Sequence, residues 1–337
     1  MPKHVQRALS FGASLAALAL VCANPAHAAQ RTFVSTSGVD NPACSIGAPC
    51  RTFAAAMLAT SPSGEIVVLD SGGYGPVTIA QSVSIIASPG VYAGISVTSG
   101  HGIAIATTVT DTVVLRGLSI NNQGSNGRGI YITGAGIVRI EDVHVAGFTV
   151  ASGLYAGPTA VLQLHVRRST FSNNSTGIAL NAANGGTETT QISATFSDIE
   201  IANNINGLNV GNNTAATLSR SVVVNNSGRG IGSNPAAGQT ATINVDDCEI
   251  SGNNQAIYPG DTPGTTVLQV SASRIVSNVT GIATGLGSTI RVSGTSIENN
   301  AYGINIIPAA GTIESAGNNV LRGNANFEPV LTTFSLR

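Results

Sequence analysis

Alternating apolar and polar residues, punctuated by glycine and asparagine, recur along most of this 337-residue chain. In the stretch 161–180, VLQLHVRRSTFSNNSTGIAL, apolar residues alternate from Leu162 to Val166, which is typical of a strand. The doublet Asn173-Asn174 predicts a tight turn, because asparagine tolerates left-handed backbone angles. Gly177-Ile178 then opens a second short strand. Each unit of this kind predicts two or three short strands and no helix.

The unit repeats. A Gly-Ile or Gly-Leu step returns every 22 to 30 residues, and Ala256-Ile257 fills the one gap. A period in this range indicates a solenoid, and the absence of helix excludes the helical repeat arrays. The sequence therefore predicts an all-β, single-stranded, right-handed parallel β-helix of roughly 11–12 coils. The steps lie at Gly129-Ile130, Gly153-Leu154, Gly177-Ile178, Gly207-Leu208, Gly230-Ile231, Gly281-Ile282 and Gly303-Ile304.

The coils can be aligned on the apolar residue that closes the strand before each Asn turn. This alignment uses Ile120, Val145, Phe171, Ile201, Val224, Ile250, Ile275, Ile297 and Leu321. Two residues earlier, on the same face of the strand, it predicts a column of small and apolar side chains that contains Val222 and Cys248. A catalytic thiol needs exposure and a neighbouring base, so Cys248 is interpreted as a buried structural thiol.

Charged residues gather immediately before that column, and their sign alternates from coil to coil. The pairs are Arg116-Gly117, Glu141-Asp142, Arg167-Arg168, Ser197-Asp198, Arg220-Ser221 and Asp246-Asp247, with His144, Glu200, Glu249 and Arg274 just after the column. Opposite charges on neighbouring coils would form a ladder of ion pairs that holds the coils in register. The alternative is a ligand-binding stripe. In it Arg167 and Arg168 would meet carboxylates or phosphates, and Asp246, Asp247 and Glu249 would bind a cation or act as acid and base.

The two ends of the chain depart from the repeat. Residues 1–28 have the features of a secretory signal, with Lys3 and Arg7 before an apolar run and Ala26-His27-Ala28 as the cleavage site. The mature protein is therefore expected to be secreted or periplasmic. Export allows disulfides, and Cys44 and Cys50 flank a short loop, so these two cysteines are predicted to pair.

The segment 52–59, TFAAAMLA, is rich in helix formers and is stopped by Ser61-Pro62, which predicts one short helix. A solenoid needs its open end covered, so this helix is interpreted as an N-terminal cap. The expected organisation is a signal at 1–28, a cap at 29–64, the β-helix at 65–325 and a covering tail at 326–337.

Composition narrows the function. Without Lys3 and Arg7 the mature chain has 13 arginines, no lysine and 16 acidic residues. It therefore lacks the excess of positive charge that is typical of proteins that bind nucleic acid. No second long apolar run exists, so no transmembrane segment is expected. Tryptophan is absent and aromatic residues make up 4% of the chain, which counts against a deep saccharide groove but leaves room for one lined by hydrogen-bonding groups.

The coil length, the Asn turns and the strand pattern resemble the right-handed parallel β-helix of the pectin lyase-like superfamily, over roughly Glu65 to Asn324. The N-terminal CSIGAPCRTFAAAM is similar to a segment that opens a set of uncharacterised secreted bacterial β-helix proteins. The resemblance implies a fold shared by polysaccharide lyases, glycoside hydrolases, tailspikes and adhesins, and leaves the oligomeric state open.

The enzyme motifs of that superfamily are incomplete. A polygalacturonase-like set would combine Gly100-His101-Gly102 with Asp246-Asp247, but these lie several coils apart, and the Asn-Thr-Asp and the lysine of the set are missing. A lyase-like site needs acidic Ca²⁺ ligands beside a basic residue, and Asp246, Asp247 and Glu249 near Arg220 and Arg274 match by residue type alone.

Two hypotheses remain. The favoured one is a non-catalytic exported β-helix without a cofactor, which binds a surface glycan or partner or serves as a rigid element. The alternative is a polyuronate lyase or a glycosidase centred on Asp246, Asp247 and Arg274, with Ca²⁺ in the lyase case.

Overall fold

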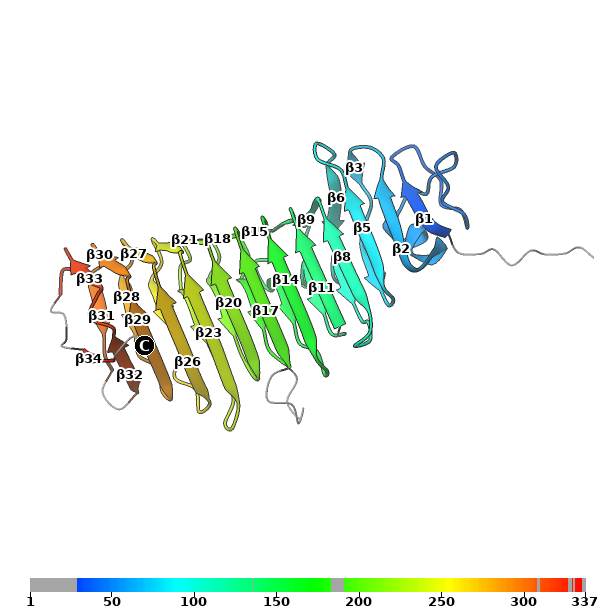
Figure 1. Cartoon of the computed structure of the whole chain (residues 1–337). Coiled ribbons are helices and arrows are strands. Elements are labelled where there is room, and N and C mark those ends of the chain that lie inside the picture. Colours follow the sequence, from blue (N-terminus) through cyan, green and yellow to red (C-terminus); the bar gives the residue numbers. More distant parts are fainter. Residues whose placement is uncertain are drawn as a thin grey trace, which may run out of the picture.

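The chain coils into an elongated solenoid built almost entirely of short parallel strands (Figure 1). The computed structural model describes residues 29–134, 136–182, 191–307, 310–326, 329 and 331–334. The expected signal segment, 1–28, lies outside these residues. A complete coil contributes one strand to each of three parallel sheets, which have 13, 11 and 10 strands in the described residues. Every strand pairs with its counterpart in the next coil, as the repeat predicts.

The sheet of 13 strands contains the long strand of each coil. Its members, in spatial order, are β1 (Ala29–Val34), β2 (Thr60–Val68), β5 (Val83–Ala87), β8 (Thr112–Arg116), β11 (Gly136–Glu141), β14 (Leu162–Arg167), β17 (Ile192–Ser197), β20 (Thr214–Ser219), β23 (Thr240–Asp246), β26 (Thr265–Ser271), β29 (Ser288–Ser293), β32 (Gly311–Ser315) and β34 (Thr332–Thr333).

The sheet of 11 strands follows after a short connection that we call the first turn. It contains β3 (Gly72–Gly73), β6 (Ala93–Val97), β9 (Leu118–Asn122), β12 (His144–Ala146), β15 (Thr170–Ser172), β18 (Glu200–Ala202), β21 (Val222–Val224), β24 (Glu249–Ser251), β27 (Arg274–Val276), β30 (Ser296–Glu298) and β33 (Val320–Arg322).

The sheet of 10 strands follows after the Asn-containing connection, which we call the second turn. It contains β4 (Val77–Ile79), β7 (Ile103–Ile105), β10 (Ile130–Ile132), β13 (Ser152–Ala156), β16 (Thr176–Leu180), β19 (Asn206–Val210), β22 (Arg229–Ser233), β25 (Gln255–Tyr258), β28 (Thr280–Ala283) and β31 (Tyr302–Asn305).

The interior is a set of apolar columns that run along the axis. Alternate residues of each strand point inward, and the parallel register places like on like from coil to coil. One column joins Val166, Phe196, Leu218 and Val245 through directly paired positions, and each of these residues is at most 2% exposed. This continuous core fills the space between the three sheets.

A buried column of asparagines runs along the second turn. Within it, the side-chain Nδ2 of Asn204 donates to Oδ1 of Asn226 at 3.0 Å, and Nδ2 of Asn226 donates to Oδ1 of Asn253 at 2.9 Å. After Asn174, the Oδ1 of each member also accepts from the backbone N–H of the preceding asparagine, so the ladder satisfies buried amides along seven coils. Its members are Asn174, Asn204, Asn226, Asn253, Asn278, Asn300 and Asn324.

The residue before each ladder asparagine has a positive φ. Asn173, Asn203, Asn225 and Asn299 have φ between 54° and 57°, which confirms the predicted left-handed conformation for the first member of these doublets. In Asn253-Asn254 the doublet is displaced by one residue: Gly252 takes the positive φ and Asn253 joins the ladder.

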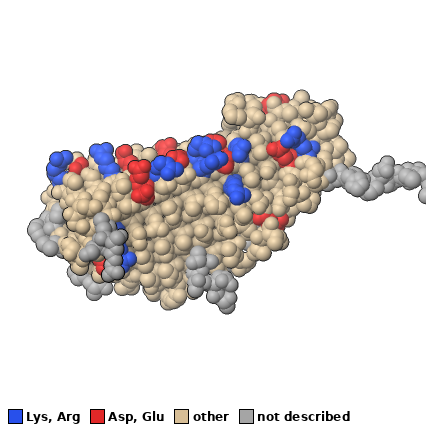
Figure 2. Space-filling view, viewed as in Figure 1, with Lys and Arg blue, Asp and Glu red and all other residues tan. Residues whose placement is uncertain are grey.

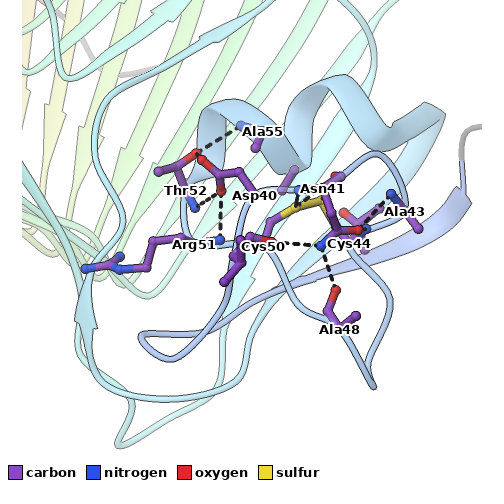
Figure 3. Close-up of a disulfide and its surroundings, with 12 residues drawn as sticks. Asp40, Asn41, Ala43, Cys44, Ala48, Cys50, Arg51, Thr52 and Ala55 are labelled. Atoms are coloured by element: carbon purple, nitrogen blue, oxygen red, sulfur yellow. Dashed lines mark hydrogen bonds between the residues drawn. A yellow bond between two sulfur atoms is a disulfide. The ribbon is translucent and has the colours of Figure 1, made fainter.

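The N-terminal end is covered by a helix and a disulfide loop (Figure 3). Helix α1 (Phe53–Ala59) begins at Thr52, whose Oγ1 accepts from the Ala55 N–H at 3.1 Å, and Phe53 is fully buried. The disulfide between Cys44 and Cys50 confirms the predicted pairing. The predicted fold class, including the short cap helix, is confirmed.

Three details differ from the sequence prediction. Among the described residues, ten coils have all three strands, and the larger sheets continue past them because the end coils lack one or two strands there. Strand β1 was not predicted: it pairs with β2, so the longest sheet already begins at Ala29, within the expected cap. No helix in the described part of the chain is long and apolar enough to cross a membrane.

The third difference is a correction to the alignment of one coil. Val223, and not Val224, pairs with Ile201 and Ile250, so the core column contains Ser221 in place of Val222. Val223 is 0% exposed and Val222 is 38% exposed. Three consecutive valines gave the sequence no means of choosing the inward face.

Candidate functional site

The predicted charged stripe lies along the first turn, where acidic and basic side chains follow one edge of the rod (Figure 2). Two positions of the repeat supply most of it. The first is the last residue of the long strand, occupied by Arg116, Glu141, Arg167, Ser197, Ser219 and Asp246 in successive coils. The second is the next residue, occupied by Gly117, Asp142, Arg168, Asp198, Arg220 and Asp247. The aligned pair in the fifth coil is therefore Ser219-Arg220, and the predicted Arg220-Ser221 was displaced by one residue.

The backbone explains why the second position is polar. Residues at this position have φ between 46° and 74° in eight successive coils, from Gly117 to Gly294. A left-handed residue ends the long strand and turns the chain sharply into the next sheet, and apolar β-branched side chains are poorly tolerated there. Glycine and aspartate suit this geometry, and the exposed arginines pair with the aspartates of the adjacent coils.

Glu141 is the centre of the stripe. Its carboxylate accepts from Arg116 at 2.9 Å and from Arg167 at 2.8 Å, which are its neighbours in the preceding and following coils. The residue is only 7% exposed. Burial raises the pKa of Glu141, but the hydrogen bond from Arg167 and the charge of Arg116 outweigh it, and the pKa lies below its usual value. The carboxylate is thus held in its charged form by two arginines.

Two further pairs connect coils through the second position. Arg168 binds both carboxylate oxygens of Asp142 at 2.8 and 2.9 Å, and Arg220 binds both oxygens of Asp198 at 3.0 and 3.1 Å. The hydrogen bond from Arg168 lowers the pKa of Asp142, and that from Arg220 lowers the pKa of Asp198. These bidentate pairs fix both the distance and the orientation of adjacent coils.

The residues predicted as catalytic, Asp246, Asp247 and Arg274, are not drawn together in this way. Asp246 accepts from the Ser271 hydroxyl at 2.6 Å, and Glu249 accepts from the Ser251 hydroxyl at 3.3 Å. Arg274 is paired in register with Glu249. Even so, none of the four side chains forms an ion pair with a described residue; they are Asp246, Asp247, Glu249 and Arg274. Among the described residues, no three His, Cys, Asp or Glu side chains are grouped so that they could hold a metal ion.

Cys248 lies beneath this end of the stripe as a buried thiol, 4% exposed. Its backbone N–H donates to the Ser273 hydroxyl at 3.1 Å, and burial raises the pKa of the thiol to about 11. A thiol in this state is protonated at neutral pH and is a weak nucleophile.

A second group of candidate residues, which the sequence interpretation missed, lies on the outer face of the 10-stranded sheet. The guanidinium of Arg128 lies 4.9 Å from the ring centre of Tyr131 and 4.3 Å from that of Tyr155; we call these three residues the N-terminal stack. Arg229 lies 4.7 Å from the ring centre of Tyr258, and these two form the C-terminal stack.

The two stacks occupy equivalent places in the repeat. In each, the arginine stands directly before the glycine of the Gly-Ile step, and the tyrosine of the next coil follows the buried apolar residue. The signal in the sequence is an arginine directly before the Gly-Ile step, in Arg128-Gly129-Ile130-Tyr131 and Arg229-Gly230-Ile231.

Comparison with known proteins supports the fold. A family model described as "Right handed beta helix region" matches residues 186–327. The solved structure of the pectate lyase Pel9A is similar with a TM-score of 0.52 and 15% identity, over 88% of this chain and 78% of that one. The chain is a right-handed parallel β-helix of the pectin lyase-like fold, as its sequence predicted.

Two further solved structures show weaker likeness. The mannuronan C-5 epimerase AlgE4 A-module of Azotobacter vinelandii has a TM-score of 0.47 at 14% identity, over 81% of this chain and 91% of that one. A rhamnogalacturonan lyase has a TM-score of 0.42 at 10% identity, over 80% and 76% of the two chains. A sequence search of curated proteins found no match.

Proposed function

We propose that this protein is an exported, non-catalytic β-helix that serves as a rigid binding element, and that its charged stripe is a structural ladder. The observation that carries the proposal is that the charges in the stripe from Arg116 to Arg220 form ion pairs with one another. Glu141 binds Arg116 and Arg167, and the two bidentate pairs join Arg168 to Asp142 and Arg220 to Asp198. A ligand would have to displace these contacts before it could use the arginines.

The ladder is better suited to specifying register than to adding stability. Exposed ion pairs contribute about 0–1 kcal/mol each, so four or five of them alter the total only modestly. A misaligned coil would place these charges beside serine or like charges, and this penalty favours the native stacking. The disulfide between Cys44 and Cys50 is compatible with the oxidising compartment that export implies.

A second candidate function is a polyuronate lyase or glycosidase at the far end of the stripe. The observation in its favour is that Asp247, Glu249 and Arg274 are exposed there and form no ion pair with a described residue. This function would need Ca²⁺ on the acidic side chains and Arg274 as the base, whereas no three acidic side chains of the described residues are grouped to hold a metal ion. The shared fold is otherwise its only support, and fold alone does not define activity.

The test is product release by the purified protein. Polyuronates and bacterial polysaccharides would be incubated with and without Ca²⁺, and unsaturated products and new reducing ends measured. The proposal expects no release from any substrate. Asp142→Ala is the matched control, because it makes the same change within the ladder. If products are released by the wild type and by Asp142→Ala but not by Asp247→Ala, the protein is an enzyme and the proposal is wrong.

Ligand binding by the stripe itself is tested separately. If the stripe is a structural ladder, Arg167→Ala and Asp247→Ala should fold and should bind any glycan as the wild type does. Loss of glycan binding in both variants, with unchanged circular dichroism, would show that the stripe is a binding site.

A further inference from the structure

We propose that the outer face of the 10-stranded sheet binds a linear acidic glycan that lies along the rod axis, with acid groups on Arg128 and Arg229. This inference rests on the proposed binding function and adds the face and the chemical class of the ligand. It is carried by the two arginine–tyrosine stacks and by the polar hollow between and beside them.

The first argument is the state of the two arginines. Both are half-buried, and neither forms an ion pair with a described carboxylate, in contrast to the arginines of the first turn. A guanidinium that stacks on a ring keeps its N–H groups in the plane, where they can bind a carboxylate or sulfate. One acid lies near: Asp261 accepts from the Tyr258 hydroxyl at 2.5 Å, so it is engaged by the tyrosine.

The second argument is the surface between the stacks. A hollow of about 390 Å³ is lined by Arg229 and by residues that include Asn206, Asn209 and Gln255. Amides both donate and accept, which suits a ligand covered with hydroxyl groups. Tyr131 and Tyr155 are partly exposed, and a tyrosine ring offers an apolar face with a polar edge, which suits a pyranose ring. Tyr258 is only 8% exposed, so its part is to hold Arg229 in place.

The third argument is spacing. Paired positions lead from Tyr155 through Ala179, Asn209 and Gly232 to Tyr258, and the same four steps lead from Arg128 to Arg229. At about 4.8 Å per step the two stacks are ~19 Å apart, a distance that about four pyranose units cover. Ala179 and Gly232 lie between the stacks, and their small size leaves room for a ligand on the surface there. A single anion would use one stack, whereas a linear chain reaches both.

N-terminal to the first stack, the His101 ring packs at 4.2 Å from the ring centre of Tyr131, and its Nδ1 accepts from the Arg128 backbone N–H at 3.0 Å. Burial and the charge of Arg128 lower the pKa of His101. The neutral imidazole therefore supports the stack and leaves the charge to the arginine.

The experiment is calorimetric titration of the mature protein with defined oligosaccharides. Dimers and hexamers of galacturonate carry carboxylates, heparin-derived chains of the same lengths carry sulfates, and maltohexaose is the neutral control. Acidic hexamers should bind, dimers should bind much more weakly because they reach one stack, and the neutral hexamer should not bind. Preference between the two acidic series identifies the anion.

The variants locate the site. Arg128→Gln and Arg229→Gln should each weaken hexamer binding at least about tenfold, because a charged hydrogen bond is lost. Arg139→Gln is the matched control: Arg139 lies on β11 of the 13-stranded sheet and also has no ion pair with a described residue. Its binding should equal that of the wild type, and melting curves should show all three variants folded.

The outcomes separate this inference from the proposed function. If no acidic hexamer binds, or if Arg128→Gln and Arg229→Gln bind like the wild type, the inference is wrong. Binding that is insensitive to both variants overturns the face while leaving a binding function intact. Cleavage of the hexamer by the wild type overturns the proposed function, whatever the arginine variants do.

Discussion

The two short turns of each coil have a similar backbone conformation but are joined to the neighbouring coils by different interactions. Both contain a residue with positive φ, such as Arg220 in the first turn and Asn225 in the second. In the first turn the inter-coil contacts are ion pairs between exposed side chains. In the second they are amide hydrogen bonds between asparagines that are nearly inaccessible to water, such as Asn226 at 0% exposure.

The difference lies in what happens when a partner is lost. An exposed arginine that loses its aspartate is solvated by water, so little free energy changes. A buried amide that loses its partner has no water to replace it, and the desolvation penalty remains. The second turn should therefore hold the coil together, while the first turn should mainly select the register.

The largest effect is expected for Asn226→Ala. This substitution removes the acceptor of the Asn204 backbone and side-chain N–H groups and the donor to Ile201 O and Asn253 Oδ1. Each buried group left unsatisfied costs about 1–3 kcal/mol, so the free energy of unfolding should fall by about 3 kcal/mol or more. Urea unfolding measures the loss.

Asn225→Gly is the matched control for that variant. Asn225 is exposed and has φ 54°, which glycine adopts without strain. Its effect should stay within about 1 kcal/mol. Equal losses in the two variants would contradict the assignment of stability to the buried ladder.

Glu141→Gln should have an intermediate effect, because Glu141 is the one nearly buried carboxylate of the first turn. Loss of its charge-assisted bonds to Arg116 and Arg167 should cost about 1–2 kcal/mol at neutral pH. Thermal unfolding at pH 7 measures it. If Glu141→Gln lowers the stability no more than the loss of an exposed ion pair does, the burial of Glu141 adds nothing to its interaction with the arginines.

The same residue gives a dependence on pH. The pKa of Glu141 is lower in the folded state than the usual 4.5, so its contribution is complete above that value and is lost as the pH falls through the lowered pKa. The difference in stability between the wild type and Glu141→Gln should therefore shrink below about pH 4.5. A difference that stays constant down to pH 3 would contradict the role of its charge.

A smaller, stabilising change is expected for Ala272→Gly. Ala272 occupies the second position of the first turn with φ 47°, which is strained for a residue with a Cβ. Glycine relieves the strain but loses more entropy on folding, so a net gain of about 0.5–1 kcal/mol is expected in urea unfolding. A loss of stability would show that this turn tolerates alanine without strain.

The smallest effect is expected for Arg220→Gln, which breaks the bidentate pair with Asp198. Both side chains are about half exposed, so the loss of stability should be the smallest of the series and should diminish in high salt. A loss comparable to that of Asn226→Ala would remove the contrast between the two turns.

The sequence by itself determined the solenoid, several of its strands and the N-terminal cap. The alternation from Leu162 to Val166 lies in strand β14, as predicted, and the helix at 52–59 differs only in that Thr52 caps it. These features are encoded locally, by alternation, by glycine and asparagine at turns, and by a run of helix formers after a capping residue. The pairing of Cys44 with Cys50 is equally local.

Only the tertiary structure decided which residues meet across coils. Along the asparagine ladder, contacts between coils join residues 22 to 33 positions apart. Because the repeat varies in length, a shift of one residue exchanges the inward and outward faces. This is why Val223 could not be chosen from three valines, and why the buried member of each asparagine doublet was not identified. The stacking of Arg128 on Tyr155 and of Arg229 on Tyr258 arises from the same lateral pairing, which brings together residues that have no proximity along the chain.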